Sequence, residues 1–150
     1  MRFVVQRVRK AVCTANDEVS GRIGKGYVVL VGVEDSDTRE IAERMMSKLI
    51  KMRIFEDDFG KTNLDLKTVG GAILMVSQFT LYADCRKGNR PSFTKAGSPD
   101  YANELYEYCV ELGEKEGIEM QTGVFGADMA VSLLNDGPFT IILDSKELGY

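Results

Sequence analysis

Two polar interruptions of apolar segments are the places where this sequence is best suited to chemistry. The first is Ser77, Gln78, Phe79 and Thr80, within the apolar segment 72–82. Buried polar groups cost roughly 1 to 3 kcal/mol each when they are left unpaired. The side chains of this stretch therefore indicate either a satisfied hydrogen-bond network or the wall of a pocket, and we favour the pocket.

The second interruption is the stretch 135–140, with Asn135, Asp136, Gly137, Pro138, Phe139 and Thr140 lying between apolar runs. Glycine adopts backbone angles closed to other residues, whereas proline fixes φ and is the residue whose preceding bond is most readily cis. Such a corner projects carbonyl oxygens in directions that side chains do not easily imitate. Taken alone, the stretch predicts an ordinary hairpin turn; a substrate-facing loop is the alternative.

The chain contains no histidine, which excludes several common mechanisms. A Ser-His-Asp or Cys-His relay and a His-ligated metal site are all ruled out. Cys13, Cys85 and Cys109 are widely spaced and predict neither a disulfide framework nor a zinc site. Asp57 and Asp58 are interpreted as turn formers because hard cations need several converging oxygens. We expect no metal and no cofactor, and proton transfers must use carboxylates, backbone, water or substrate.

A formal net charge of −4 argues against general nucleic-acid binding, which usually needs a basic face. One local segment, 86–97, is an exception because it contains basic residues and no acidic ones: Arg86, Lys87, Arg90 and Lys95. It is either a solvated loop or a phosphate-binding patch.

The length of 150 residues predicts one domain, spanning residues 1–150. No apolar run approaches the roughly 20 residues needed to cross a bilayer, and the alternating N-terminus lacks a signal-peptide core. We therefore expect a cytoplasmic protein.

The elements that must position these residues follow from hydrophobic periodicity. Helices are predicted over 38–52, capped by Ser36 and Asp37, and over 98–116. Strands are predicted over 2–14, 19–23, 26–33, 53–56, 72–82 and 119–125, with two final strands bracketing 135–140. Two helices against seven or more strands predict a layered α+β fold and not a doubly wound nucleotide-binding fold.

The two polar stretches together resemble the signature motifs of the D-aminoacyl-tRNA deacylases, also called D-tyrosyl-tRNA deacylases. The resemblance covers essentially the whole chain in order and spacing. It includes Gln6-Arg7-Val8, the segments 49–63 and 88–93, and Gly126-Ala127 with Met129.

The resemblance implies a fold, an activity and an assembly. Members of the family are cytosolic homodimers that hydrolyse the ester joining a D-amino acid to tRNA, a form of chiral proofreading in translation. The implied fold is a three-layer α/β/β domain of α/β class with mixed sheets and two main helices, and its active site lies at the dimer interface. The Gly137–Pro138 bond is expected to be cis. Its carbonyls are expected to enter the partner's pocket, bind the substrate amino group and exclude an L side chain.

The resemblance also implies catalytic roles. Backbone N–H groups around Phe79 and Thr80 would form the oxyanion site, while Ser77 and Gln78 would orient substrate or water. A neighbouring ribose hydroxyl of the substrate could assist proton transfer. Thr80 as a covalent nucleophile is the rival interpretation, although no base in the sequence would activate it.

Further residues are expected to bind substrate. Arg7 would brace the inserted motif, Asn135 and Thr140 would flank it, and Met129 would pack with Phe79 on the terminal adenine. The tRNA phosphates would meet Arg86, Lys87, Arg90 and Lys95.

One departure from the family is Phe139, which stands where a smaller valine is common. The larger ring is expected to change the shape of the pocket and so the range of amino acid side chains that the substrate can carry. Two other functions stay open from the sequence. One is a non-catalytic nucleic-acid-binding module, suggested by the basic segment, and the other is a Thr80-dependent esterase acting on small esters.

Overall fold

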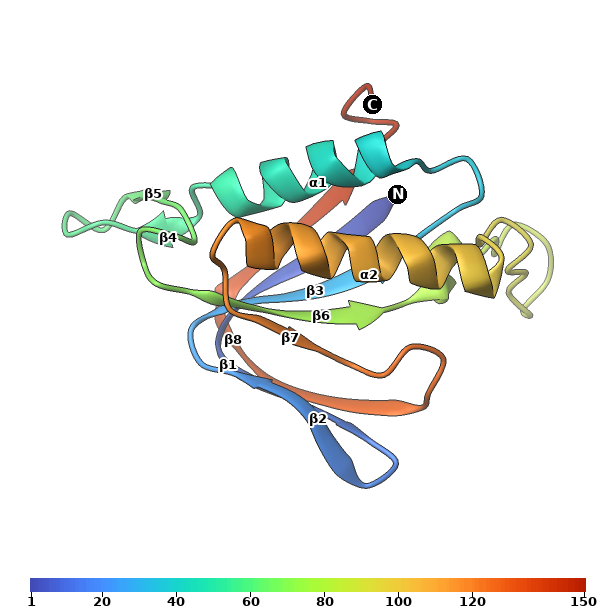
Figure 1. Cartoon of the computed structure of the whole chain (residues 1–150), viewed down its shortest axis with the longest axis horizontal. Helices are drawn as coiled ribbons and strands as arrows, with labels where there is room; N and C mark the ends of the chain where they lie inside the picture. Colours follow the sequence, from blue (N-terminus) through green and yellow to red (C-terminus); the bar gives the residue numbers. More distant parts are fainter.

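A computed structural model describes residues 1–150 and contains eight β-strands, two α-helices and one short 3-10 helix (Figure 1). In chain order the elements are β1 (Arg2–Ala15), β2 (Glu18–Ile23), β3 (Gly26–Gly32), α1 (Arg39–Lys51), β4 (Phe55–Glu56), β5 (Thr62–Leu64), β6 (Ala72–Ser77), η1 (Phe79–Tyr82), α2 (Pro99–Lys115), β7 (Met120–Thr122) and β8 (Met129–Asp144).

The main sheet is mixed and has the order β2-β1-β3-β6-β7, with β8 on the other edge of β1. Strand β1 pairs antiparallel with β2, β3 and β8, whereas β3–β6 and β6–β7 are parallel. Parallel neighbours require long crossover connections, and α1 and α2 lie in these two crossovers. The sheet curls until β2 approaches β7, where a Cβ on Gly21 would lie 2.7 Å from the Thr122 carbonyl oxygen.

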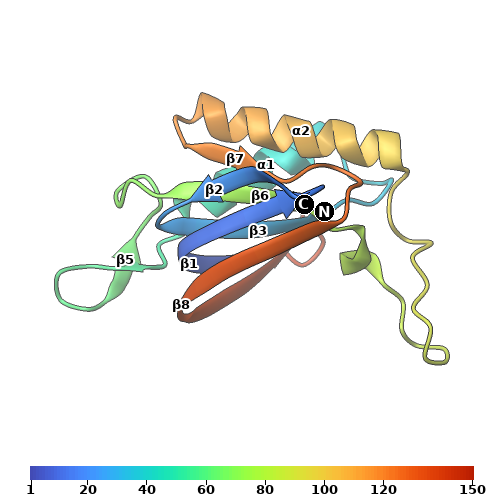
Figure 2. The ribbon, with the colours of Figure 1, turned by 90° about the horizontal axis from the view of Figure 1, so that it is seen from below.

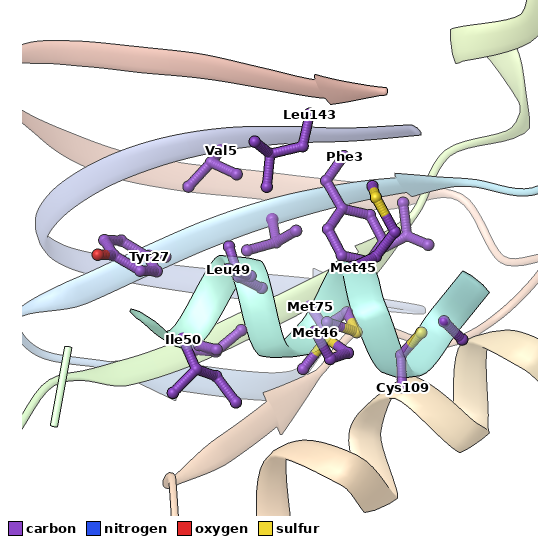
Figure 3. Packing of buried hydrophobic residues seen from close by; sticks show 14 of the residues in the cluster. Phe3, Val5, Tyr27, Met45, Met46, Leu49, Ile50, Met75, Cys109 and Leu143 are labelled. Atoms are coloured by element: carbon purple, nitrogen blue, oxygen red, sulfur yellow. The ribbon is translucent and has the colours of Figure 1, made fainter. Parts of the chain in front are cut away.

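Both faces of β3 and β6 are covered, which gives three layers. Residues such as Val29 and Met75 point into the larger core beneath the two helices, whereas Val28 and Leu74 point into a smaller core closed by the curled part of β1 and β2. Figures 1 and 2 show both helices on one side of β3 and β6, and Figure 3 shows the core beneath α1. The predicted α/β/β arrangement with mixed sheets and two helices is confirmed.

The cap of α1 differs from the prediction. The side chain of Thr38 accepts a hydrogen bond from the Ile41 N–H (3.3 Å), so Thr38 and not Ser36 or Asp37 begins the helix. The Asp37 carboxylate is buried, where it pairs with the Met1 amino group and accepts from the Glu34 N–H (2.8 Å). A cationic partner brought close by the fold therefore outcompetes the local capping role.

Three predicted strands are shorter than expected, and the one predicted over 53–56 covers only Phe55–Glu56. The strand predicted over 72–82 ends at Ser77, and the following residues form the 3-10 helix η1. The Gln78 N–H donates to the Val31 carbonyl oxygen (2.7 Å). This bond joins residue 78 to β3, and the chain turns away from the sheet at the next residue, where η1 begins. The strand predicted over 119–125 covers only Met120–Thr122.

The predicted hairpin at 135–140 is wrong. Strand β8 is a single strand, and both apolar runs pair with the same partner, β1. Asn135 pairs with Val8 and Thr140 pairs with Gln6, so Arg7 alone lies opposite the intervening segment 136–139. That segment bulges out of the ladder, because an excess of residues on one strand has no partners on the other.

Truncation of the core beneath α1 tests this packing. Leu49 is fully buried, so Leu49→Ala is expected to lower the free energy of unfolding by about 2 to 5 kcal/mol through the cavity it leaves. Val19 is 54% exposed, and Val19→Ala is expected to change it by less than about 0.5 kcal/mol. Urea denaturation measures both, and equal effects of the two substitutions would contradict the packing described.

Candidate active site

A cavity of about 360 Å³ lies where β6 ends, at the carboxyl end of the parallel strands. Ten of its fifteen lining residues are hydrophobic, so a ligand would be held mainly by apolar contact and oriented by a few polar groups. The polar and aromatic groups of the lining, together with one methionine, include Ser77, Gln78, Phe79, Tyr106, Asp128 and Met129.

Ser77 and Gln78 belong to the polar part of the cavity lining, whereas Thr80 does not line the cavity and contacts it through Gln78. The Gln78 amide nitrogen donates to Thr80 Oγ1 at 2.6 Å. An amide is not a base, so this contact orients the threonine hydroxyl without activating it as a nucleophile. The first N–H groups of a helical turn lack partners within the turn. In η1 these belong to Phe79 and Thr80, the two residues predicted to supply an oxyanion site.

An exposed aromatic pair stands at the mouth of the cavity. Phe79 is 58% exposed, and its ring meets that of Phe93 edge-on with centroids 5.1 Å apart. Exposed aromatic side chains of this size are platforms on which a nucleobase can stack. Phe93 comes from the basic segment, so that loop is anchored beside the cavity.

The inner wall is set by Tyr106 of α2. Its hydroxyl donates to the Met75 carbonyl oxygen at 2.7 Å, and its ring lies 5.9 Å from that of Phe125. Burial raises the pKa of Tyr106 well above its ordinary value, so the hydroxyl stays protonated and structural. Sequence reasoning did not single out Tyr106, although it follows Leu105 on the apolar face of the predicted helix.

Asp128 was also missed, and it is the one carboxylate that lines the cavity. It lies between Gly126-Ala127 and Met129. The family resemblance pointed to these neighbouring residues but not to the aspartate between them. No group of three or more His, Cys, Asp or Glu residues is arranged to hold a metal ion. No helix is long and apolar enough to cross a membrane, and all three cysteines are free.

The bulge at 136–139 is held by Arg7, which is only 5% exposed. Arg7 Nε donates to the Asp136 carbonyl oxygen (3.0 Å) and Nη1 donates to the Ile54 carbonyl oxygen (2.5 Å), while the guanidinium lies over the Phe139 ring at 4.7 Å. The Gly137–Pro138 peptide bond is cis, and both residues are exposed. The bulge therefore projects a braced main-chain edge to the outside of the molecule.

The two predicted parts of the site do not meet within one chain. Arg7 pairs with Tyr27 beside Ile73, near the start of β6, whereas Ser77 pairs with Val31 at its end. Four residues of strand separate these levels, or about 13 Å. None of Arg7, Asn135, Gly137, Pro138 and Thr140 lines the cavity; the Thr140 hydroxyl instead donates to Gln6 Oε1 (2.7 Å).

The four predicted phosphate-binding cations lie in the loop between η1 and α2, and all are exposed. Arg86 is paired with Asp84, and this guanidinium holds the pKa of the Asp84 carboxyl well below its ordinary value. The charge of Arg86 is therefore largely balanced within the chain. Lys87, Arg90 and Lys95 form no ion pair and remain the effective cations of this loop.

Comparison with known proteins yields a consistent set of relatives. A family model described as D-Tyr-tRNA(Tyr) deacylase matches residues 4–144. A D-aminoacyl-tRNA deacylase of Geobacillus sp. (strain WCH70) is 54% identical over 98% of this chain and 97% of its own. A protein of the same name from Thermus aquaticus is 51% identical over 98% of this chain and 97% of its own.

Solved structures agree on the fold. A structure described as c-Myc DNA unwinding element binding protein superimposes with a TM-score of 0.88 and 38% identity, covering 96% of this chain and 98% of its own. A probable eukaryotic D-amino acid tRNA deacylase gives a TM-score of 0.83 at 20% identity, covering 95% and 97% of the two chains. At that identity the second likeness is evidence for the fold alone.

The bracing of the bulge can be tested by two arginines that both contact Asp136. Arg7→Met would leave two carbonyl oxygens without their charged donor, so the free energy of unfolding is expected to fall by about 2 to 4 kcal/mol. Arg9 is 70% exposed, and Arg9→Met is expected to cost less than about 1 kcal/mol despite its ion pair with Asp136. Chemical denaturation of both variants provides the comparison, and a larger loss in the Arg9 variant would refute the role given to Arg7.

Proposed function

Because the chain belongs to the D-Tyr-tRNA(Tyr) deacylase family, we propose that it hydrolyses the ester bond of D-aminoacyl-tRNA and releases the free D-amino acid and tRNA. The observation that carries this proposal is the cavity at the end of β6. There, hydrogen-bond donors at the start of η1 border an apolar space in a chain that has no histidine.

The proposed chemistry relies on placement and polarisation. The ester carbonyl is bound with its oxygen at the N–H groups of Phe79 and Thr80, which stabilise the negative charge that develops on attack. A water molecule positioned by Ser77 and Gln78 supplies the oxygen that forms the acid. The bond between the carbonyl carbon and the ribose oxygen breaks. The proton lost by the attacking water is passed, with help from the neighbouring ribose hydroxyl, to the departing ribose oxygen.

Thr80 is assigned to this donor set and not to covalent catalysis. A nucleophilic hydroxyl needs a base within hydrogen-bond reach. The contact that the structure gives Thr80 Oγ1 is with the Gln78 amide, which cannot accept the proton.

Selection for the D-enantiomer is assigned to the bulge at Gly137 and Pro138. In the proposed homodimer the bulge of one subunit enters the cavity of the other, where its carbonyls bind the substrate amino group. A main-chain wall excludes the opposite hand for any side chain without reading the side chain itself. Two features support this arrangement: the bulge is braced by Arg7, and its exposed residues Gly137 and Pro138 do not line the cavity of their own chain.

The homodimer is supported by the character of β8. This strand pairs with β1 on one edge only, and Leu133, Leu134 and Ile142 are 37%, 48% and 61% exposed. A long edge strand offers unpaired backbone groups for pairing with another chain, and exposed apolar side chains along it favour such a contact. A second copy would cover it and bring the bulge to the partner's cavity, and we place this assembly in the cytoplasm, where aminoacyl-tRNA is used.

The contacts with the terminal adenine and the phosphates are assigned to residues in and beside the cavity. We assign Phe79 and Met129, which both line the cavity, to packing against the terminal adenine, and Phe93 to supporting Phe79 from the side. Beside them, Lys87, Arg90 and Lys95 are proposed to meet tRNA phosphates, with a smaller contribution from the paired Arg86.

A second candidate function is nucleic-acid binding without catalysis. It is favoured by the 38% identical structure, which is described as a DNA-binding protein. Binding of tRNA without turnover of its ester would support this alternative and exclude the first proposal.

The reaction is tested by comparing D-Tyr-tRNA, L-Tyr-tRNA and Gly-tRNA as substrates. Release of D-tyrosine is expected at enzyme concentrations far below that of the substrate, with L-Tyr-tRNA left intact. Failure to turn over D-Tyr-tRNA would overturn the proposal, and the glycyl ester measures how strictly an amino acid without a side chain is spared.

The role of Thr80 is tested by Thr80→Ala. If Thr80 is not a nucleophile, kcat is expected to stay within about tenfold of the parent enzyme, because the backbone donors remain. Loss of a covalent nucleophile commonly costs about 10⁴-fold or more. A loss of that size, with the fold intact by circular dichroism, would restore the covalent role.

The bulge is tested by Gly137→Ala. Gly137 has φ +128, and a Cβ there would lie 3.0 Å from the Phe139 nitrogen and 3.4 Å from Arg7 Nη2, so the added methyl must deform the wall. The ratio of kcat/KM for D-Tyr-tRNA over L-Tyr-tRNA is expected to fall by about tenfold or more. Gly70→Ala is the matched control, since Gly70 also has positive φ (+59) but opens to free space. Equal ratios in the two variants would contradict the role of the bulge.

A further inference from the structure

A second cavity, of about 740 Å³, lies at the C-terminal end of α1, away from the candidate active site. Its cationic lining residues are Arg44, Lys48, Lys51 and Arg53, which we call the α1 basic surface. We propose that the α1 basic surface binds tRNA phosphates when the acceptor end occupies the partner subunit's cavity. This inference rests on the proposed function and extends the substrate contact beyond the loop 86–97.

The charges of the α1 basic surface are not neutralised by the protein. None of its four cations forms an ion pair with a carboxylate, although the chain carries a net charge of −4. The single acidic side chain of the lining, that of Glu43, accepts a hydrogen bond from the Tyr108 hydroxyl at 2.6 Å. Tyr150, which also lines the cavity, carries the C-terminal carboxylate, and that group forms no ion pair with the four cations. Four unpaired cations around one hollow of an acidic protein create a local positive field that attracts an anionic ligand.

The four side chains are also arranged and partly held in place. Arg44, Lys48 and Lys51 follow one another by about one helical turn, which places them on one face of α1 roughly 5 to 6 Å apart. The Arg44 guanidinium lies over the Tyr150 ring at 4.3 Å, and Arg53 Nε donates to the Asn63 carbonyl oxygen at 2.7 Å. A row of positioned cations fits the repeated charges of a nucleic-acid backbone better than one isolated anion.

The helix dipole explains only part of the arrangement. Lys48 and Lys51 lie in the last turn of α1, where the negative end of the dipole favours cations. Arg44 lies before that turn and Arg53 lies after the helix, so the dipole does not account for them. Convergence of all four on one cavity is the observation that points to a ligand.

The position of the α1 basic surface connects it to substrate binding. Ile54 lines the cavity next to Arg53, and its carbonyl oxygen accepts the hydrogen bond from Arg7 Nη1 that braces the bulge. The α1 basic surface therefore adjoins the part of the chain that is proposed to enter the partner's cavity. A tRNA whose acceptor end lies in that cavity would carry its backbone past this surface.

The test compares two single charge reversals in the full-length protein. Lys48→Glu is placed on the α1 basic surface, and Arg22→Glu, on an exposed position of β2, is the matched control with the same change of net charge. Each variant is assayed on D-Tyr-tRNA and on a D-tyrosyl ester of adenosine, which offers the reacting ester without the tRNA backbone. Affinity for uncharged tRNA is measured by filter binding as a function of salt.

Lys48→Glu is expected to raise KM for D-Tyr-tRNA about tenfold and to lower the salt dependence of tRNA binding by about one unit of slope. Its kinetics on the adenosine ester are expected to match those of the parent enzyme, and Arg22→Glu is expected to behave as the parent on both substrates. Equal effects of the two reversals, or loss of activity on the small ester by Lys48→Glu, would overturn the inference. Failure of the proposed function itself is distinguishable, because the parent enzyme would then cleave neither ester.

Discussion

The buried guanidinium of Arg7 is the interaction on which the arrangement of this protein most depends. A charge removed from water is tolerated only when its donors are matched by acceptors, and here two main-chain carbonyls and an aromatic face supply the match. Those partners belong to β8 and to the segment before β4, which are far apart in sequence. One side chain on the central strand therefore shapes the bulge and fixes the segment that follows α1.

The location of the cavity is a consequence of the parallel part of the sheet. The crossovers through α1 and α2 cover one face of β3 and β6, and the curled antiparallel strands cover the other. With both faces used for packing, the free space lies beyond the strand ends, where Ser77 passes into η1. The polar stretch begins at the last residue of the buried strand and continues beyond the core, where the side chains of Gln78 and Thr80 hydrogen-bond to each other.

Two basic regions lie on a protein whose net charge is negative, an uneven distribution that suits the binding of an RNA substrate. A protein of net charge −4 has little general attraction for nucleic acid, so affinity must come from local groups that its own acids do not neutralise. The loop after η1 loses one of its cations to Asp84, whereas those of the α1 basic surface stay free of carboxylates. Two separated basic regions of this kind would guide one end of a long polyanion and leave the rest of the surface inert.

Much was determined by the sequence alone. The periodicity of 38–52 and 98–116 specified both helices, the β-branched run 26–33 specified a central strand, and the absence of histidine limited the chemistry. These properties depend on neighbouring residues or on composition, so they can be predicted without knowing which distant residues come into contact. The cap of α1 was predicted wrongly because the pairing of Asp37 with the Met1 amino group is not encoded in neighbouring residues.

Only the tertiary structure decided the form of the stretch 135–140. From sequence it indicated a turn, since Gly and Pro commonly end strands, but both flanking runs pair with β1, and Arg7 is left opposite the excess residues. The same holds for the cavity, whose wall includes Tyr106 and Asp128 from distant segments, and for the convergence of Arg53 with Arg44. Residue type and spacing specify which groups are available, but the pairing of strands distant in the chain specifies which of them meet.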